Sequence, residues 1–565
     1  MGVPKFFSYL QKTYKKDNFY INREDANIPN DIKNKLNNLD YLLLDANGLM
    51  HPVCFKVIAD NPTVTNHRTL QNIMHGEIIK KIEDLVNYAK PKQGVYIAVD
   101  GVAPVAKMRQ QRFRRFKSVA ERLVFDKLKK KYNKPISHEW NNSVITPGTD
   151  FMNVLHNRLL EWCKHKMEKQ NFTIIYSSCN SPGEGEHKLI KFIKEKGKEF
   201  SYVIHGMDAD LIFLSLATGL NNIFLLREAV ELDSKDTSGA LYKYVSIDKL
   251  MIAIPLTMKS FINSESNDKN LIDDFIFLCY FLGNDFLPHL HAIDIAYDGI
   301  EILMKAYGES YNKYKKYLLN NNDINQEFMI YLVKMIADKE EELLITYHKN
   351  KKHWRMILSD PYERELNHIE HLKFPIDDPV KVGTDNYNSW RKRYYLHYWS
   401  IDNNEELEEF VEKLVHHYLL GLKWVTLYYF DKCPSWDWYY PFDNPPFIGD
   451  IYLYLQKLNM NSFKFTVGEP LCPYEQLLTV LPPQSKFILP KPLQKLMTDK
   501  KSSIIYLYPK IIQQDFIGKN RYYQGIPILP PMDIALVKHI YNKYKNELSD
   551  KEIQMIKKES VFIFE

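Results

Sequence analysis

Two glutamates flank a glycine at the point where a helix is expected to begin. The stretch PGEGEHKLI (182–190) places Glu184 and Glu186 two residues apart, directly after a serine, a proline and a glycine that signal a helix start. Acids in a first helical turn also stabilise the helix dipole, so the pair alone has a structural explanation. Further acids nearby would favour a chemical role.

Aspartates follow several short apolar runs that are expected to form strands. The runs at 41–45 and 95–100 end in Asp45 and Asp100, and the run at 202–208 leads into Asp208 and Asp210. Ligands of an open α/β sheet bind beyond the carboxyl ends of its strands, so these side chains should converge on one crevice. Apolar strands rarely end in bare acids without a functional reason.

A seventh acid, Asp285, follows the apolar stretch FIFLCYFLGN (275–284). An Asn-Asp pair there is also typical of a turn, but as part of the acidic set we interpret Asp285 as a further metal ligand. Crowded carboxylates repel one another unless cations neutralise them, and an all-oxygen site suits Mg²⁺ or Mn²⁺. The predicted metal-binding and catalytic residues are Asp45, Asp100, Glu184, Glu186, Asp208, Asp210 and Asp285.

A basic face follows the strand that carries Asp100. In VAKMRQQRFRRFKSVAERL, four polar residues recur at i, i+4, i+7 and i+8 and share one face of a helix. Guanidinium groups bind phosphate oxygens in bidentate fashion, and the position beside an acidic metal centre favours a terminal-phosphate pocket over a solvated helix face. The predicted phosphate-binding residues are Lys107, Gln111, Arg114 and Arg115. A solvated helix explains the later basic run KLKKKYNK, to which we assign no function.

Alternation of short apolar runs with longer amphipathic stretches predicts an α/β fold, with a mostly parallel twisted sheet flanked by helices. The expected strands are 41–45, 95–100, 172–177, 202–208 and 222–227. The chain has 565 residues, 45% of them hydrophobic, which is enough for a large core and more than one domain.

Overall composition narrows the class of protein without identifying a partner. The net charge of +5, from 75 basic and 70 acidic residues, is too balanced to indicate nucleic-acid binding by itself. The six cysteines show no CxxC pair or zinc spacing, which favours reduced thiols in an intracellular protein. No apolar run of membrane-spanning length and no signal peptide is evident, and Phe6 occupies the position where a myristoylation motif requires Ser or Thr. We expect a cytoplasmic protein, with a nuclear location left open.

The motifs, taken in order, resemble the XRN-type 5′-to-3′ exoribonucleases, which degrade decapped RNA that carries a 5′-monophosphate. The resemblance runs from residue 1 to about 540 and matches a short form with only the two conserved catalytic regions. The matching segments are MGVPKFF, LLLDANGLMH, VDGVAPVAKMRQQRFRRF, ITPGTDFM, SPGEGEHKLI, GMDADLIFLSL, LGNDFLPHL and SWDWYYPFDNPPF.

The resemblance implies a role for each matching residue. All seven acids fall on metal-binding acids of these nucleases, and Lys107 to Arg115 fall on the 5′-phosphate pocket, which excludes capped and triphosphate ends. His51 matches a residue that stacks on a base at the RNA 5′ end, and its aromatic partner would be Trp436 or Trp438. Burial in a core is the alternative for either tryptophan, and the sequence does not distinguish the two.

The implied reaction is processive and uses two divalent ions about 4 Å apart. The ions would activate a water and stabilise the leaving oxygen at the first internucleotide phosphate, releasing nucleoside 5′-monophosphates one at a time. Each cut would create a new 5′-monophosphate, and a narrow channel would admit only single-stranded RNA. We expect a monomer; the sequence names no protein partner.

The expected organisation has three parts. Residues 1–348 would form the catalytic nuclease domain, 349–386 a connector rich in charge and turn residues, and 387–565 a helical, aromatic-rich region that walls the active site. The start of the last part, near Tyr387, is where the second conserved region implied by the resemblance begins.

Two other functions fit parts of the pattern. A flap-type structure-specific DNA nuclease uses a similar ring of acids, but Asp285 leads into FLPHLHAIDIAYDGIEIL, without the glycine-rich helix-hairpin that holds duplex DNA. An inactive RNA-binding scaffold is the other alternative, and the intact acids argue against it. The sequence therefore favours an active exoribonuclease.

Overall fold

The computed structural model describes residues 5–23, 25, 28–136, 140–168, 172–229, 241–350 and 358–565. The first four residues of the MGVPKFF motif and residues 351–357 of the expected connector lie outside these ranges. Among the described residues, no helix combines the length and apolar character needed to span a bilayer.

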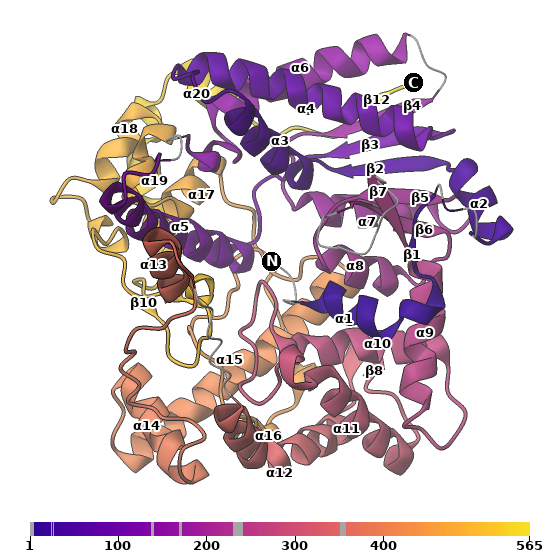
Figure 1. Ribbon diagram of the computed structural model, residues 1–565, viewed down its shortest axis with the longest axis vertical. Coiled ribbons are helices and arrows are strands. Elements are labelled where there is room, and N and C mark those ends of the chain that lie inside the picture. Colours follow the sequence, from indigo (N-terminus) through magenta and orange to yellow (C-terminus); the bar gives the residue numbers. More distant parts are fainter. Residues whose placement is uncertain are drawn as a thin grey trace.

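An eight-stranded sheet lies at the centre of the first half (Figure 1). Its spatial order is β1-β7-β6-β5-β2-β3-β4-β12. The strands are β1 (Tyr20–Ile21), β2 (Tyr41–Asp45), β3 (Gly94–Ala98), β4 (Thr173–Ser177), β5 (Tyr202–His205), β6 (Ile223–Glu228), β7 (Tyr242–Ser246) and β12 (Phe562–Phe564). Strands β6, β5, β2, β3 and β4 are parallel, and the outer strands pair antiparallel. The mostly parallel α/β fold expected from the sequence is confirmed.

The five expected strands correspond to β2 to β6, with differences at their ends. Strand β3 ends at Ala98 and β5 at His205, so Asp100 and Asp208 lie in the loops that follow, and Asp210 is the first residue of a helix. Sequence patterning missed β1, β7 and β12. Strands β1 and β12 have only two or three residues, and β7, which reads YKYVS, lacks the apolar run that marks the other strands.

Helices cover both faces of this sheet, apart from α5 (Val105–Lys131), which extends away from it. The covering helices are α1 (Phe6–Thr13), α2 (Asn30–Asn37), α3 (Ala46–Asp60), α4 (His67–Ala89), α6 (Asp150–Met167), α7 (Gly185–Lys196), α8 (Asp210–Thr218), α9 (Ile247–Lys259) and α10 (Asp268–Cys279). Successive residues of a strand point to opposite faces. Accordingly, Leu42 and Leu44 of β2 pack in the core formed with α3, α4 and α6, whereas Leu43 packs in the core formed with α7 to α10.

The second half of the chain is mainly helical. It contains α11 (Gly299–Tyr314), α12 (Gln326–Lys349), α13 (Pro361–Glu370), α14 (Tyr387–Trp399), α15 (Asn404–Phe430), α16 (Ile448–Leu455), α17 (Pro473–Val480), α18 (Lys491–Gln494), α19 (Ile534–Tyr544) and α20 (Asp550–Gln554). Two small hairpins join them, β8 (Leu319–Asn320) with β9 (Asp323–Ile324) and β10 (Gln514–Asp515) with β11 (Ile526–Pro527). The core below the sheet continues without interruption through α10 and α15 to α16.

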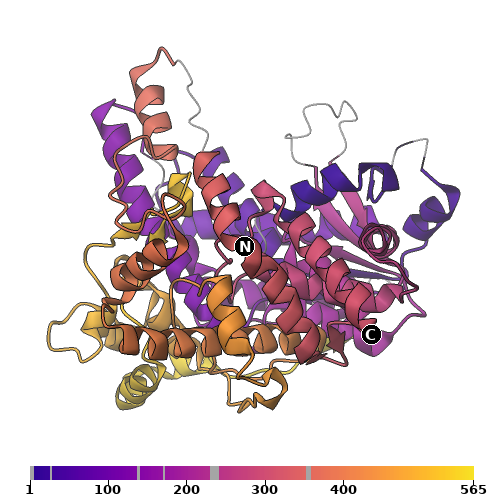
Figure 2. The same ribbon diagram turned by 90° about the horizontal axis from the view of Figure 1, so that it is seen from below.

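Helix α5 leaves the sheet and is supported by the second half of the chain. Its amino-terminal part packs on α17, and its far part lies beside α13, so that the two helices project together from the body (Figure 2). Arg109 donates to Asp443 at 2.8 Å, and buried Arg112 donates to the carbonyl of Leu507 at 2.7 Å. These contacts fix the helix that carries the predicted phosphate-binding residues.

A buried acid fastens the second half to α10. Asp274 is fully buried and accepts hydrogen bonds from Tyr307 Oη at 2.6 Å and from the backbone N–H groups of Leu318 and Leu319, both at 2.8 Å. Asp274→Ala should lower the free energy of unfolding by about 3 kcal/mol or more, because three buried donors lose their acceptor. Denaturant unfolding followed by circular dichroism measures this loss.

Asp273→Ala is the matched control. Asp273 is the preceding residue on the same helix, and it pairs with Lys269 near the surface, so its loss should cost less than about 1 kcal/mol. Equal destabilisation by the two substitutions would contradict the structural role of Asp274.

Candidate active site

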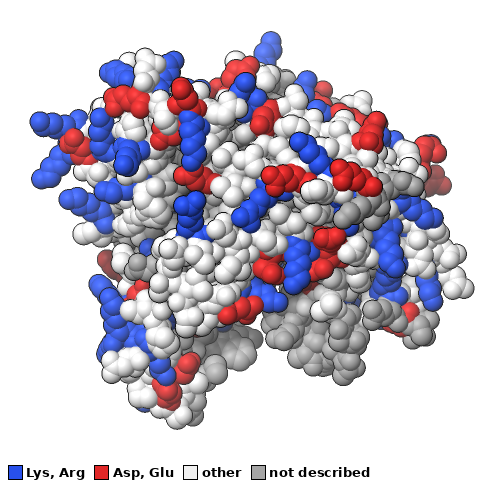
Figure 3. All heavy atoms as spheres, turned by 90° about the horizontal axis from the view of Figure 1, so that it is seen from above, with Lys and Arg blue, Asp and Glu red and all other residues white. Residues whose placement is uncertain are grey.

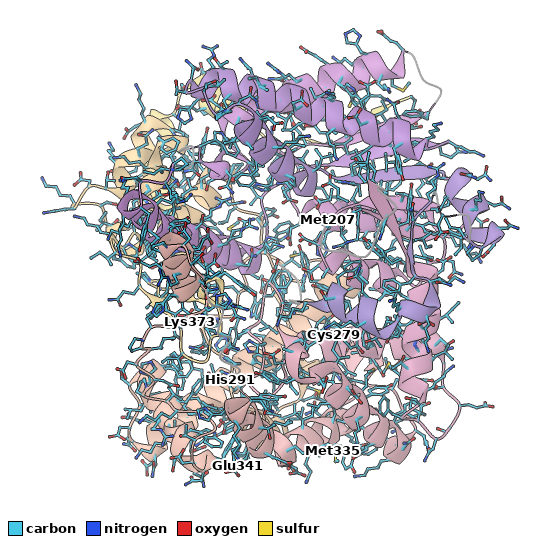
Figure 4. The ribbon with its side chains drawn as sticks, viewed as in Figure 1. Met207, Cys279, His291, Met335, Glu341 and Lys373 are labelled. Carbon is cyan, nitrogen blue, oxygen red and sulfur yellow. The ribbon has the colours of Figure 1, made fainter. Side chains whose placement is uncertain are left out.

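A cavity with a volume of about 620 Å³ lies at the carboxyl ends of the central strands, between the sheet and α5. Met207, which lines it, lies near the middle of the molecule (Figure 4). Its wall contains six of the seven predicted metal-binding acids, the four predicted phosphate-binding residues and His51. The six acids are Asp45, Asp100, Glu184, Glu186, Asp208 and Asp285. The structure therefore brings both charged sets to one place.

The seventh acid, Asp210, lies just behind this wall. It is 4% exposed at the start of α8 and does not line the cavity. Burial and the neighbouring Asp285 raise its pKa to about 7. Asp210 thus belongs to the same electrostatic cluster, although it does not face the open space.

The glycine between the two glutamates lets three loops approach closely. The N–H of Gly185 donates to Asp100 Oδ1 at 2.6 Å. A Cβ at this position would lie 3.0 Å from the carbonyl oxygen of Ala98 and 3.2 Å from carboxylate oxygens of Asp45 and Asp100. A side chain here would push the surrounding carboxylates and backbone apart by a few tenths of an ångström, so glycine favours the close approach of the acids and fits the spacing Glu-Gly-Glu.

A second local feature positions Asp285. The side-chain oxygen of Asn284 accepts from the N–H groups of Phe286 and Leu287, both at 2.9 Å, and so forms the turn expected for an Asn-Asp pair. Gly283, at φ 82°, precedes the turn, and a Cβ there would lie 2.8 Å from the backbone nitrogen of His289. The turn and the metal-ligand interpretations of Asp285 are therefore compatible.

Burial and mutual repulsion disfavour the ionised form of several of these acids. Burial, together with Asp100 and Asp208, raises the pKa of Asp45 to about 8, and burial raises the pKa of Glu186 well above its ordinary value. A bound divalent cation would reverse both effects, because it supplies the positive charge that the cluster lacks. The carboxylate donor set thus fits a hard, oxygen-preferring cation.

Lys107 partly neutralises the cluster. Its ammonium nitrogen lies 2.5 Å from Glu184 Oε2 and 2.8 Å from Asp285 Oδ2. Although burial opposes ionisation of these carboxyls, Lys107 lowers the pKa of both, and they in turn raise the pKa of the lysine well above its ordinary value. The structure places this predicted phosphate ligand between two predicted metal ligands.

The rest of the basic face forms a pocket beside the acids. Arg115 donates to Thr146 Oγ1 at 2.7 Å, and Gln111 Oε1 accepts from Gln476 at 3.2 Å. Burial and the adjacent Arg114 lower the pKa of Arg115 to about 9. Within the described part of the chain, neither arginine forms an ion pair, although both line the cavity. Two uncompensated guanidinium groups in one pocket have a strong tendency to bind an anion.

The residues expected to stack on a base are not all in this wall. His51 lines the cavity, and burial together with Arg114 and Arg115 lowers its pKa to about 4, so its ring is neutral. Neither Trp436 nor Trp438 lines the cavity. Trp438 is half-buried against the core and stacks on Trp424, with ring centroids 5.2 Å apart.

Comparison with known proteins covers nearly the whole chain. The model described as "XRN 5'-3' exonuclease N-terminus" matches residues 1–229, and the model described as "Xrn1 helical domain" matches residues 265–373 and 363–564. The chain belongs to the XRN family. The resemblance inferred from its motifs is confirmed.

Curated relatives of this XRN chain are named as exoribonucleases. It is 28% identical to 5'-3' exoribonuclease 2 of Debaryomyces hansenii, with 100% of this chain and 72% of the relative aligned. It is also 28% identical to 5'-3' exoribonuclease 2 of Arabidopsis thaliana (98% and 68%) and 29% identical to 5'-3' exoribonuclease 1 of Homo sapiens (94% and 33%). These matches support a 5′-to-3′ exoribonuclease that acts on RNA, rather than a flap-type nuclease or an inactive scaffold.

Surface charge would not have identified this XRN enzyme. On the face shown in Figure 3, basic and acidic side chains are interspersed among uncharged ones, in keeping with the nearly balanced composition. The informative charge is inside the cavity, where the two signs are separated.

Several functional neighbours of this XRN site escaped sequence reasoning. Tyr428 of α15 donates to Glu184 Oε1 at 2.7 Å and stacks on His187 at 3.8 Å. His187 has potential ligand atoms within 4.8 Å of those of Glu184 and Glu186, and burial lowers its pKa to about 4, which leaves a neutral ring. Gln476 connects Gln111 to α17. Of these three, His187 alone had a local signal, because it lies inside the GEGEH motif.

Asn47 is a further neighbour with a local signal. Its side-chain oxygen accepts from the N–H of Asp100 at 3.0 Å, which joins the loop after β3 to the start of α3. It stands two residues after Asp45 in the LDANG segment, so the sequence shows that it lies near Asp45. Its hydrogen bond with Asp100 is evident only from the structure.

Proton release provides a test of the acidic cluster. Because burial and neighbouring acids raise the pKa of Asp45 to about 8 and that of Asp210 to about 7, protons should bind the cluster at low pH and compete with cations. Apparent Mn²⁺ affinity should rise about tenfold or more between about pH 6 and about pH 8. Isothermal titration calorimetry in buffers of different ionisation enthalpy measures both the affinity and the protons released; pH-independent binding would contradict the raised pKa values.

The bond from Tyr428 provides a second test. Tyr428→Phe removes one donor to Glu184 but keeps the ring that stacks on His187, so Mn²⁺ affinity should fall about threefold to tenfold. Calorimetric titration of Mn²⁺ measures the change. Tyr418→Phe, a buried tyrosine on the same helix whose hydroxyl donates to the carbonyl of Pro288, should leave the affinity unchanged.

Proposed function

We propose that this XRN-family exoribonuclease acts processively on single-stranded RNA with a 5′-monophosphate, and that it uses two divalent ions, Mg²⁺ or Mn²⁺. The products would be nucleoside 5′-monophosphates. The observation that carries the proposal is the pair of arginines, Arg114 and Arg115, which line the same cavity as the acids and have no anionic partner among the described residues. A terminal phosphate would supply the missing negative charge.

The acids would hold the ions at the ends of the strands. Asp45, Asp100 and Asp208 come from neighbouring strand ends, and Glu184 and Glu186 enter from the start of α7. When bound, two such ions supply an activated water and neutralise charge on the leaving oxygen. Lys107 would reduce the net negative charge around the ions, because its ammonium pairs with the carboxylates of Glu184 and Asp285.

The basic pocket would bind and position the 5′-phosphate of the RNA. Arg115 is held by Thr146, and Gln111 by Gln476, so their side chains are fixed before RNA binds. A fixed pocket aligns the next phosphodiester with the acids, which lowers the entropic cost of reaching the reactive geometry. Each cut would expose a new 5′-monophosphate for the same pocket, and this repetition would make the reaction processive.

Base stacking would help to hold the RNA end. The neutral ring of His51 lies beside both arginines and suits a stacked base of any sequence. Its aromatic partner on the RNA would be Trp436 or Trp438, although neither lines this cavity and Trp438 also stacks on Trp424. The carbonyl of Trp436 accepts from the N–H of Val105 at 2.9 Å, which holds it at the start of α5.

The same contacts support the proposed division into a catalytic domain (1–348), a connector (349–386) and a second region (387–565) that walls the site. Tyr428 and Gln476 both belong to the second region, and each contacts a residue of the first that lines the cavity.

Matched RNAs that differ only at the 5′ end test the substrate. With Mg²⁺ present, RNA with a 5′-monophosphate should be degraded at least about 100-fold faster than RNA with a 5′-triphosphate or a 5′-hydroxyl. The triphosphate would be too large for the pocket, and the hydroxyl lacks the negative charge that the two arginines bind. Gel analysis of radiolabelled RNA measures the rates, and Asp208→Ala should abolish them. Equal rates for all three ends, or internal cuts, would refute the proposal.

Replacement of both arginines tests the pocket directly. Arg114→Ala with Arg115→Ala should lower kcat/KM for monophosphorylated RNA about 100-fold and leave Mn²⁺ binding intact, because the charged hydrogen bonds to the phosphate are lost. Lys127→Ala, an exposed basic residue farther along α5, is the control and should change neither. An undiminished preference for the monophosphate in the double variant would remove these arginines from recognition.

A further inference from the structure

An exposed aromatic side chain lies in the wall of the cavity without a role in the reaction described so far. Phe55 of α3 is 52% exposed and lines the cavity, one helical turn after His51. Single exposed aromatic residues on a convex surface need no explanation. Phe55 is different, because it shares a concave wall with the basic pocket.

A buried ring supports Phe55. Trp140 meets it edge to face, with ring centroids 6.3 Å apart and an interplanar angle of 88°. Trp140 is itself 6% exposed and packs against Phe151 at 6.2 Å. Phe55 is thus held by a buried ring, while about half of its side chain stays exposed at the cavity wall.

The spacing of His51 and Phe55 suits a planar ring between them. Four residues advance an α-helix by about 6 Å. This rise is close to twice the contact distance of about 3.5 Å between stacked carbon atoms. Both side chains line one cavity, so they share a face of α3.

The surroundings of Phe55 are polar and suit a nucleotide. Ser118 and Arg122 continue the face of α5 beyond Arg115, and the cavity wall near Trp140 contains Asn142. Arg122 is exposed, and Asn142 is half-buried. These groups can contact the sugar and the edges of a base without selecting one base, as a sequence-independent nuclease requires.

We propose that Phe55, together with His51, forms a nucleobase subsite next to the basic pocket. The inference rests on the proposed function, because the phosphate of the bound nucleotide would lie on Arg114 and Arg115. The shared chemistry is a base attached to a 5′-phosphate, and it has two sources. One is the 5′-terminal nucleotide of the RNA, and the other is the released nucleoside 5′-monophosphate.

Fluorescence of 2-aminopurine distinguishes these sources, because stacking quenches it. One titration uses RNA with a 5′-monophosphate and 2-aminopurine as its first base, and the other uses free 2-aminopurine riboside 5′-monophosphate. EDTA prevents hydrolysis. Phe55→Leu should reduce the quenching and weaken binding about fivefold or more for at least one of the two probes, and Phe55→Tyr should restore both.

The pattern of effects assigns the occupant. If Phe55→Leu reduces quenching and affinity for the RNA probe, the subsite binds the 5′ end of the substrate. If it does so for the mononucleotide alone, the subsite binds the product, and product inhibition should weaken by the same factor as mononucleotide affinity. Phe487→Leu is the matched control, since Phe487 is 59% exposed but does not line the cavity.

Unchanged quenching and affinity of both probes in Phe55→Leu would overturn the proposal. Fluorescence anisotropy of RNA labelled at its 3′ end separates this outcome from failure of the proposed function. If the parent protein binds monophosphorylated and hydroxyl-ended RNA equally, the 5′-phosphate assignment fails. If it prefers the monophosphate but ignores the change at Phe55, only the subsite fails.

Discussion

Repulsion between crowded carboxylates is the constraint on which the site depends. Asp45, Asp100, Glu184, Glu186 and Asp208 meet where the strands end, and three of them, Asp45, Glu184 and Glu186, are buried. The protein supplies partial compensation through the Gly185 N–H, Tyr428 and Lys107. The remaining negative charge is the charge that the proposed divalent cations would neutralise.

The second half of the chain is required because the first half cannot hold these groups alone. Helix α5 extends away from the sheet, and its side chains would be mobile without Asp443, Leu507 and Gln476. Tyr428 reaches Glu184 from α15. The continuous core from the sheet to α16 makes these contacts rigid, since close-packed interiors resist displacement. Catalytic geometry and overall packing are therefore coupled.

Lys107 stands at the boundary between the negative and the positive part of the cavity. Its ammonium pairs with Glu184 and Asp285, yet it lies on the same helical face as Arg114 and Arg115. If cations take over the compensation of the carboxylates, as proposed, this ammonium would become available to a phosphate. In the proposed reaction, one side chain would then link metal binding to recognition of the RNA end.

The sequence by itself determined the features that rest on local patterns. Short apolar runs predicted the central strands, and the acids at their ends indicated the carboxyl edge of the sheet. The 3.6-residue helical period predicted that Gln111, Arg114 and Arg115 share one face of α5. The tertiary structure alone decided that Lys107 pairs with two acids, that Asp210 lies behind the cavity wall, and that Trp438 stacks on Trp424. It also decided that β12 completes the sheet beside β4 and that Phe55 faces the cavity. These outcomes depend on residues far apart in the chain, such as Glu184 and Tyr428, 244 positions apart, whose meeting leaves no trace in the short-range pattern of either segment.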